Sequence, residues 1–150
     1  MQTDEALSHR FKGLYDDWGR AIARHDIDWL ARHFADDFTG SAHPWPTLKV
    51  DRAQMIELDR KIETMDVKWL SVAARRYGDT VLVSGVVKYT RESFAAGAAI
   101  AEGMPTGEEL SSLVNGKCVL YTGAWRDVAG QWQLYDHHMV GIVEGFEGTV

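Results

Sequence analysis

Titratable side chains in the second half of the chain stand among apolar and aromatic residues that alternate as in strands. The candidates for chemistry are His137, near the end, and the phenols Tyr89 and Tyr121. An imidazole titrates near neutrality, and a phenol donates a hydrogen bond to a developing anion, so these groups suit general acid–base catalysis. We expect all three side chains to be catalytic, with His43 as an alternative base.

Alternation along a strand decides which of these groups share a face. His137 and His138 point to opposite faces, so only one of them faces an interior pocket, and we favour His137. Lys88 faces away from Tyr89, and an inverted register would bury Lys88 instead. With Tyr89 inside, alternation puts Arg91 on the same face, where its guanidinium could hold a carboxylate or a phenolate.

Aromatic residues are the main material for a pocket wall, since the chain holds six Trp, five Tyr and five Phe. Their flat apolar rings suit an aromatic ligand. The histidines show no metal-ligand spacing beyond His137 and His138, which diverge on a strand, so we expect no metal ion. No glycine-rich nucleotide motif occurs, and we expect no cofactor. The residues expected to bind substrate are Trp18, Trp45, Arg91, Trp125 and Met139.

Composition excludes several classes of partner. The net charge of −6 argues against nucleic acid, because phosphate binding needs clustered basic residues. No apolar run approaches the roughly 18 residues of a membrane span, and no secretory signal opens the chain. We therefore expect one domain over residues 1–150, away from membranes and in the cytoplasm. The single cysteine, Cys118, is expected to be a small buried apolar residue.

The elements that position these groups begin with helices. Apolar residues at helical spacing predict an amphipathic helix over residues 4–25, and Asp26 can cap a second, short helix. Asp51 and Gln54 resemble a capping box, so a third helix is expected to run to about Glu63.

Strands follow the helices. Prolines on both sides of Trp45 predict an extended or turning segment. The turn signals Gly78-Asp79 and Ala129-Gly130 predict two antiparallel hairpins. Strands are expected after Phe38 and over residues 67–77, 80–90, 117–127 and 131–143.

Residues 93–116 form an insertion much longer than a hairpin loop. It is rich in Ala, Gly, Ser and Glu, and short helices are expected over 95–101 and 108–114. It is either a lid over a pocket or a surface loop.

The segment WGRAIARHDIDWLARHFADDF, from Trp18 to Phe38, resembles the opening of the nuclear transport factor 2-like superfamily. The shared features are a Trp in the first helix, a His-Asp-x-Asp break and a Phe-Ala-Asp-Asp-Phe exit. The last hairpin adds Trp125, Gly-x-Trp at Gly130 and a following His. The resemblance implies an α+β cone: three N-terminal helices packed in the concave face of a strongly bent, mostly antiparallel sheet, around an apolar pocket. It also implies a homodimer.

The same resemblance bears on the reaction. In ketosteroid isomerases of this superfamily a catalytic Asp falls at the place of Ala42 and an oxyanion-binding Tyr at that of Trp18, so their chemistry is not carried over. Scytalone dehydratase-like members use Tyr, His and Asp without a cofactor, and Tyr89, Tyr121 and His137 resemble that set.

We therefore expect a cofactor-independent lyase, dehydratase or isomerase acting on a small aromatic molecule, such as a lignin-derived diaryl or polyketide-like ring. The alternative is a non-catalytic module of the same fold that binds a small molecule or mediates dimerisation or assembly.

Overall fold

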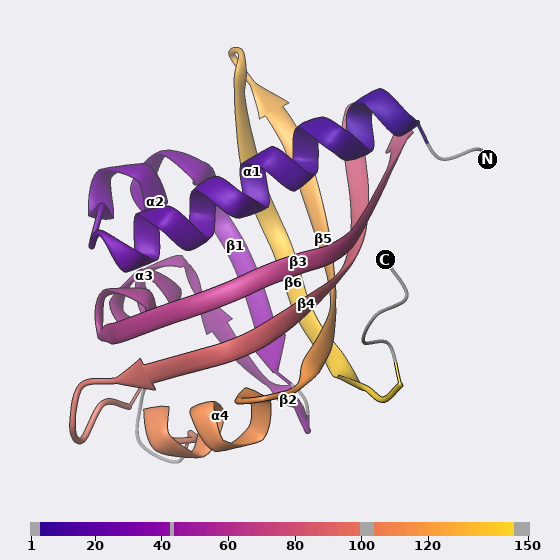
Figure 1. Ribbon diagram of the computed structural model, residues 1–150. Helices are drawn as coiled ribbons and strands as arrows, with labels where there is room; N and C mark the ends of the chain where they lie inside the picture. The colour runs from indigo at the N-terminus through magenta and orange to yellow at the C-terminus, as the bar shows by residue number, and fades with distance from the viewer. Residues whose placement is uncertain (1–3, 43, 100–103, 146–150) are drawn as a thin grey trace.

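The structure, a computed structural model, describes residues 4–42, 44–99 and 104–145, so His43 lies outside the described residues (Figure 1). Three of its helices come early in the chain and a fourth, short helix joins two long strands. The helices are α1 (Glu5–Ala23), α2 (Ile27–His33), α3 (Arg52–Arg60) and α4 (Gly107–Val114). The strands are β1 (Phe34–Ala42), β2 (Trp45–Asp51), β3 (Ile62–Tyr77), β4 (Thr80–Phe94), β5 (Cys118–Val128) and β6 (Gln131–Val143).

Side-chain caps begin the first three helices, as the sequence predicts for two of them. Asp4 accepts a hydrogen bond from the backbone N–H of Leu7, and Asp26 accepts one from Trp29. Asp51 and Gln54 form the predicted capping box, which satisfies free N–H groups at the start of α3. The buried face of α1 consists of Leu7, Phe11, Tyr15, Trp18, Ala21 and Ile22.

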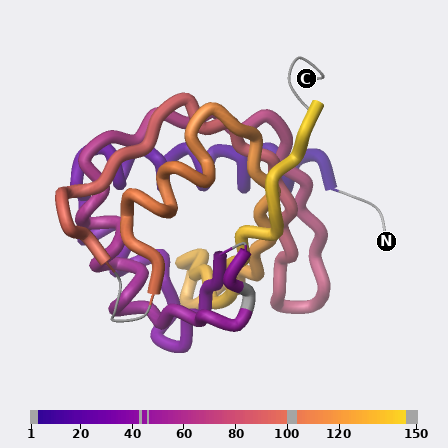
Figure 2. Tube along the Cα trace, turned by 90° about the horizontal axis from the view of Figure 1, so that it is seen from below, coloured from indigo at the N-terminus to yellow at the C-terminus, as the bar shows by residue number. Residues whose placement is uncertain are grey.

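The six strands form one mixed sheet in the order β2-β1-β6-β5-β4-β3. Strand β1 runs parallel to β6, and the other pairs are antiparallel. Both predicted hairpins are confirmed, with left-handed backbone at Gly78 in one turn and at Ala129 and Gly130 in the other. Helix α1 crosses the sheet over β3 (Figure 1), and seen from below the strands follow a strongly curved path (Figure 2). The α+β architecture expected from the sequence is confirmed.

Two local expectations need correction. Helix α3 ends at Arg60, and β3 already begins at Ile62, because the buried Ile62 pairs with Phe94 at the far end of β4. The segment that begins at Trp45 is extended, as the prolines predict, and forms the edge strand β2. In the described part of the expected 95–101 helix, no helix forms, because the backbone at Gly97 is left-handed.

Two further expectations can be compared with the described residues. Cys118 is buried, as the sequence predicts. None of the helices in the described part of the chain combines the length and the apolar character needed to cross a membrane.

Candidate active site

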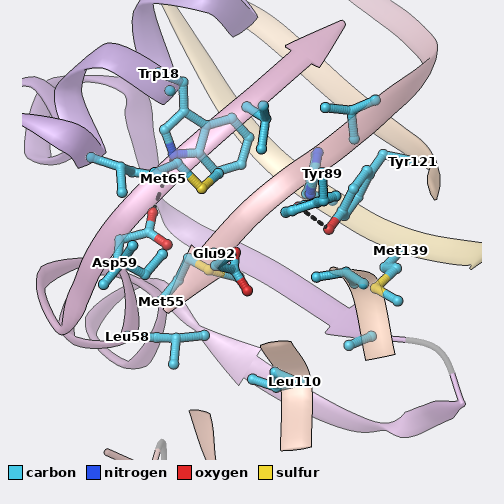
Figure 3. Close-up of a pocket in the computed structure, with 18 of the residues that line it drawn as sticks. Trp18, Met55, Leu58, Asp59, Met65, Tyr89, Glu92, Leu110, Tyr121 and Met139 are labelled. Atoms are coloured by element: carbon cyan, nitrogen blue, oxygen red, sulfur yellow. Dashed lines mark hydrogen bonds between the residues drawn. The ribbon is translucent and has the colours of Figure 1, made fainter. Parts of the chain in front are cut away.

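A cavity of about 140 Å³ lies in the interior, between α1, α3 and α4 on one side and the bent sheet on the other. Most of its lining is apolar, with Met55, Met65 and Met139 contributed by three different elements. Polar side chains enter it from α3, β4, β5 and β6 (Figure 3). The site is therefore assembled from segments that are far apart in the sequence.

Asp59, on α3, is a buried carboxylate in the lining and is only 5% exposed. The indole Nε1 of Trp18 donates a hydrogen bond to its Oδ2 atom at 3.1 Å. Burial raises the pKa of Asp59 to about 7, and the hydrogen bond from Trp18 opposes part of that rise. A carboxyl group in this state exchanges a proton near neutral pH.

Glu92, near the end of β4, is a second buried carboxylate and is 8% exposed. Its backbone is held by Asn115, whose side-chain oxygen accepts from the Glu92 N–H at 2.7 Å and whose amide donates to the Glu92 carbonyl at 3.0 Å. Ser111, on α4, donates to Oε1 at 3.5 Å. Burial, and next the nearby Asp59, raises the pKa of Glu92 to about 7.

A β-bulge explains why Glu92, and not Arg91, reaches the interior. Val67 pairs with Tyr89 and its neighbour Asp66 pairs with Arg91, so Thr90 is an extra residue on β4. Such a residue inverts the alternation beyond it. Tyr89 and Glu92 are buried, whereas Arg91 is exposed. The expectation that Arg91 shares the face of Tyr89 is therefore wrong.

The hydroxyl groups of Tyr89 and Tyr121 lie 2.7 Å apart, and both rings line the cavity. Burial is the main cause that raises the pKa of each phenol well above its ordinary value, so both stay protonated at neutral pH. One hydroxyl donates to the other, and the pair keeps one hydrogen for an acceptor in the cavity.

His137 lines the cavity and is 6% exposed, and its Nε2 atom has no hydrogen-bond partner. Its ring stacks on Tyr121 and meets Trp18 edge-on, with both pairs of ring centroids 5.0 Å apart. Burial, and to a smaller extent His138, lowers the pKa of His137 to about 3. The imidazole in the cavity is therefore neutral.

His138 lies on the other face of β6, paired with Asp136 at 2.7 Å and with the Ser41 hydroxyl at 2.6 Å. Gly123 makes room for the groups on the inner face. A Cβ atom there would lie 2.7 Å from the Tyr15 hydroxyl and 3.1 Å from Cδ2 of His137.

The other residues predicted to bind substrate divide into two groups. Trp18 and Met139 line the cavity. Trp125 is fully buried in the core, where its Nε1 donates to the Tyr15 hydroxyl at 3.3 Å, so it is not part of the lining. Trp45 is half-buried on the edge strand β2, and Lys88 is half-buried on β4; neither belongs to the described lining.

Sequence reasoning missed both carboxylates. Asp59 had a detectable signal, because a helix over 52–60 places it on the same side as Met55 and Ile56, at spacings of four and three residues. Glu92 had no such signal in the sequence, since strict alternation from Tyr89 places Glu92 on the outer face of the sheet. Among the described residues, no cluster of three or more His, Cys, Asp or Glu side chains could hold a metal ion.

The fold is that of nuclear transport factor 2-like proteins, as solved structures show. A protein of that description from Cytophaga hutchinsonii is similar with a TM-score of 0.61 and 18% identity, over 83% of this chain and 88% of that one. A superfamily protein from Salmonella enterica has a TM-score of 0.64 at 10% identity, over 97% of each chain. The association domain of C. elegans CaMKII has a TM-score of 0.60 at 12% identity, over 89% of this chain and 95% of that domain.

No model of a protein family matches the chain, and no curated protein does. The similarity to solved structures confirms the fold expected from the sequence, and at these identities it concerns the fold alone.

Proposed function

We propose that the protein is a cofactor-independent enzyme of the lyase or isomerase type that moves a proton on a small aromatic molecule bound in the cavity. The observation that carries the proposal is the convergence of two buried carboxyl groups, a phenol pair and a neutral imidazole on one apolar cavity. Structural cores rarely bury several titratable groups together, because each loses its hydration.

In this proposal the carboxylates take the role of base. The pKa values of Asp59 and Glu92, both about 7, let the ionised form accept a proton and the acid form return it at neutral pH. His137, with its pKa of about 3, is too weak a base for the role predicted from the sequence, and it acts as a hydrogen-bonding group. The hydroxyl pair of Tyr89 and Tyr121 donates to the oxyanion that develops on the substrate.

The cavity volume limits the substrate. A cavity of about 150 Å³ in an engineered protein holds one benzene ring, and the volume here, about 140 Å³, is similar. The proposed substrate therefore places a single ring in the cavity, against Trp18, Tyr89 and Tyr121. A diaryl substrate would leave its second ring outside this volume.

The experiment is a turnover screen of single-ring ketones, alcohols and enols, with proton exchange into D₂O followed by NMR. Asp59→Asn and Glu92→Gln should each lower kcat by about 10²-fold or more, because they remove a proton-transfer group without changing shape. The matched controls are Asp36→Asn and Glu63→Gln, which alter exposed carboxylates and should leave kcat unchanged. If both site variants turn a substrate over as fast as the natural chain does, the acid–base proposal is wrong.

One outcome separates catalysis from the alternative module. Ligands that bind and exchange no proton would favour a non-catalytic binding domain.

For assembly, we propose a homodimer through the outer face of the sheet, supported by exposed apolar residues on its strands and by the fold shared with an association domain. A monomer mass in sedimentation would contradict it. The exposed apolar residues are Tyr77, Leu82, Val128 and Val140.

A further inference from the structure

We infer that the molecule bound in the cavity is an organic cation: a single aromatic ring that carries an ammonium group, held by Asp59, Glu92 and His137. The inference rests on the proposed function only in using the same cavity, and it names the substrate class. Its evidence comes from the charge of the lining, the rings around it and an unpartnered nitrogen.

The charge of the lining has one sign. Asp59 and Glu92 are its only carboxylates, and no Lys or Arg belongs to the described lining. The ion pairs in the described part of the chain involve neither carboxylate. Two carboxylates held in an apolar space, with one indole and one hydroxyl as their hydrogen-bond donors, attract a cation strongly, because little water screens them.

The rings around the carboxylates fit the same class of ligand. In Figure 3 Trp18 lies above Asp59, and the Tyr89–Tyr121 pair lies to the upper right of Glu92. Aromatic faces attract ammonium groups, and the attraction grows when water is excluded. An anionic ligand would gain nothing from these faces and would be repelled by the carboxylates.

His137 provides the independent observation. It is 94% buried in the lining, and the Nε2 atom of its neutral ring lacks a partner, which is costly in a folded protein. A neutral imidazole keeps one lone pair, whereas an ammonium group has three hydrogens to donate. Two carboxylates and one imidazole thus supply three acceptors to the same lining, matching in number the hydrogens of an ammonium group. A hydroxyl group could satisfy only one of the three.

Proton release should accompany binding. The groups that face Asp59 and Glu92 are Trp18, Ser111, Tyr89 and Tyr121, and none of these is a cation. Since both carboxyl pKa values are about 7, a bound cation favours the ionised forms and expels protons from the site. Affinity for a cation should therefore rise between pH 6 and pH 8, while affinity for a neutral ring should not.

The test is calorimetric titration with three ligands of one shape: benzylamine, benzyl alcohol and benzoate. At pH 8 benzylamine should bind about tenfold or more tightly than benzyl alcohol, because its hydrogen bonds are to charged groups, and benzoate should not bind. The affinity for benzylamine should fall at pH 6. Asp59→Asn and Glu92→Gln should each lower the affinity for benzylamine about tenfold, while Glu63→Gln should bind benzylamine as the natural chain does. Near-UV circular dichroism shows whether each variant is folded.

The contradicting outcomes are also distinct. If benzyl alcohol or benzoate binds more tightly than benzylamine, or if none of the three binds to the folded protein, the inference is wrong. In that case, if the natural chain turns over a neutral substrate and Asp59→Asn does not, the acid–base proposal would still be supported. Tight binding of benzylamine without proton exchange on any ligand would support the cation site and contradict the enzyme.

Discussion

The two ends of the interior use large side chains in opposite ways. At the packed end, defined by Phe11, Trp125 and Trp132, the Phe11 ring meets the two indoles edge-to-face at 5.6 Å and 5.1 Å. At the cavity end, defined by Trp18, Asp59 and Glu92, rings and carboxylates surround an open volume. The packed end satisfies the indole N–H of Trp125 through Tyr15, and the cavity end leaves the Nε2 atom of His137 unsatisfied.

The difference separates stability from function. Close aromatic packing contributes favourable free energy, whereas buried carboxyl groups and an unpaired imidazole nitrogen oppose folding. A chain under selection for stability alone has no reason to keep the second arrangement, so the cavity end is where we expect ligand binding. Truncation of an apolar side chain should therefore cost less stability at the cavity end than at the packed end, and neutralisation of a buried carboxyl group should have the opposite sign.

The largest effect is expected from Trp125→Ala at the packed end. The substitution removes a fully buried ring and should lower the free energy of unfolding by about 3–5 kcal/mol. Leu110→Ala, in the cavity lining, is the comparison, and it should cost less than about 2 kcal/mol because its side chain already borders empty space. Urea denaturation measures both. Equal losses would contradict the distinction between the two ends.

Opposite in sign, Asp59→Asn and Glu92→Gln should stabilise the ligand-free protein at pH 8. Each carboxyl has a folded-state pKa of about 7, above its unfolded value near 4, so its favourable contribution is present below pH 4 and is lost as pH rises through 7. At pH 8 the free energy of unfolding of each variant should exceed that of the natural chain by about 1–3 kcal/mol.

Denaturation at several pH values measures this effect. The advantage of the variants over the natural chain should shrink steadily from pH 8 down to pH 5. Glu63→Gln, at an exposed carboxylate, should give the same pH dependence as the natural chain. A stability advantage that does not change with pH would mean that folding does not raise the pKa values of the two carboxyl groups.

A destabilising effect of similar size is expected at Gly123, where the two ends meet. A Cβ atom there would press on the Tyr15 hydroxyl and the His137 ring, so Gly123→Ala should cost about 1–3 kcal/mol and weaken ligand binding. Gly13→Ala is the matched control, because nothing lies within 4 Å of its Cβ position on the exposed side of α1. Gly13→Ala should raise the free energy of unfolding by up to about 1 kcal/mol. Equal behaviour of the two variants would contradict the close contact.

Local signals in the sequence predict most of the fold. The caps at Asp26 and Asp51, the turn at Ala129-Gly130 and the apolar face of α1 each depend on a few neighbouring residues, and all are found in the structure. The two positions that the resemblance to the superfamily singles out, Trp18 and Ala42, both line the cavity. The carboxyl groups in that lining come from other elements, α3 and β4.

The cavity chemistry depends on long-range pairing and is less visible in the sequence. One extra residue, Thr90, decides which side chains of β4 face inward, and only the pairing of β3 with β4 reveals it. The placement of Trp125 depends likewise on packing against Phe11 and Tyr15, which lie more than a hundred residues away. A pattern read along one strand contains neither piece of information.

The smallest effect is expected from Arg91→Gln, which isolates the consequence of the bulge. Arg91 is exposed and Glu92 buried, although strict alternation from Tyr89 predicts the reverse. Arg91→Gln should therefore change stability by less than about 0.5 kcal/mol and leave the affinity for benzylamine unchanged. Glu92→Gln, at the next position, should alter both. If Arg91→Gln weakened binding and Glu92→Gln did not, β4 would have to pair with β3 without the bulge at Thr90, and the cavity would present the opposite charge.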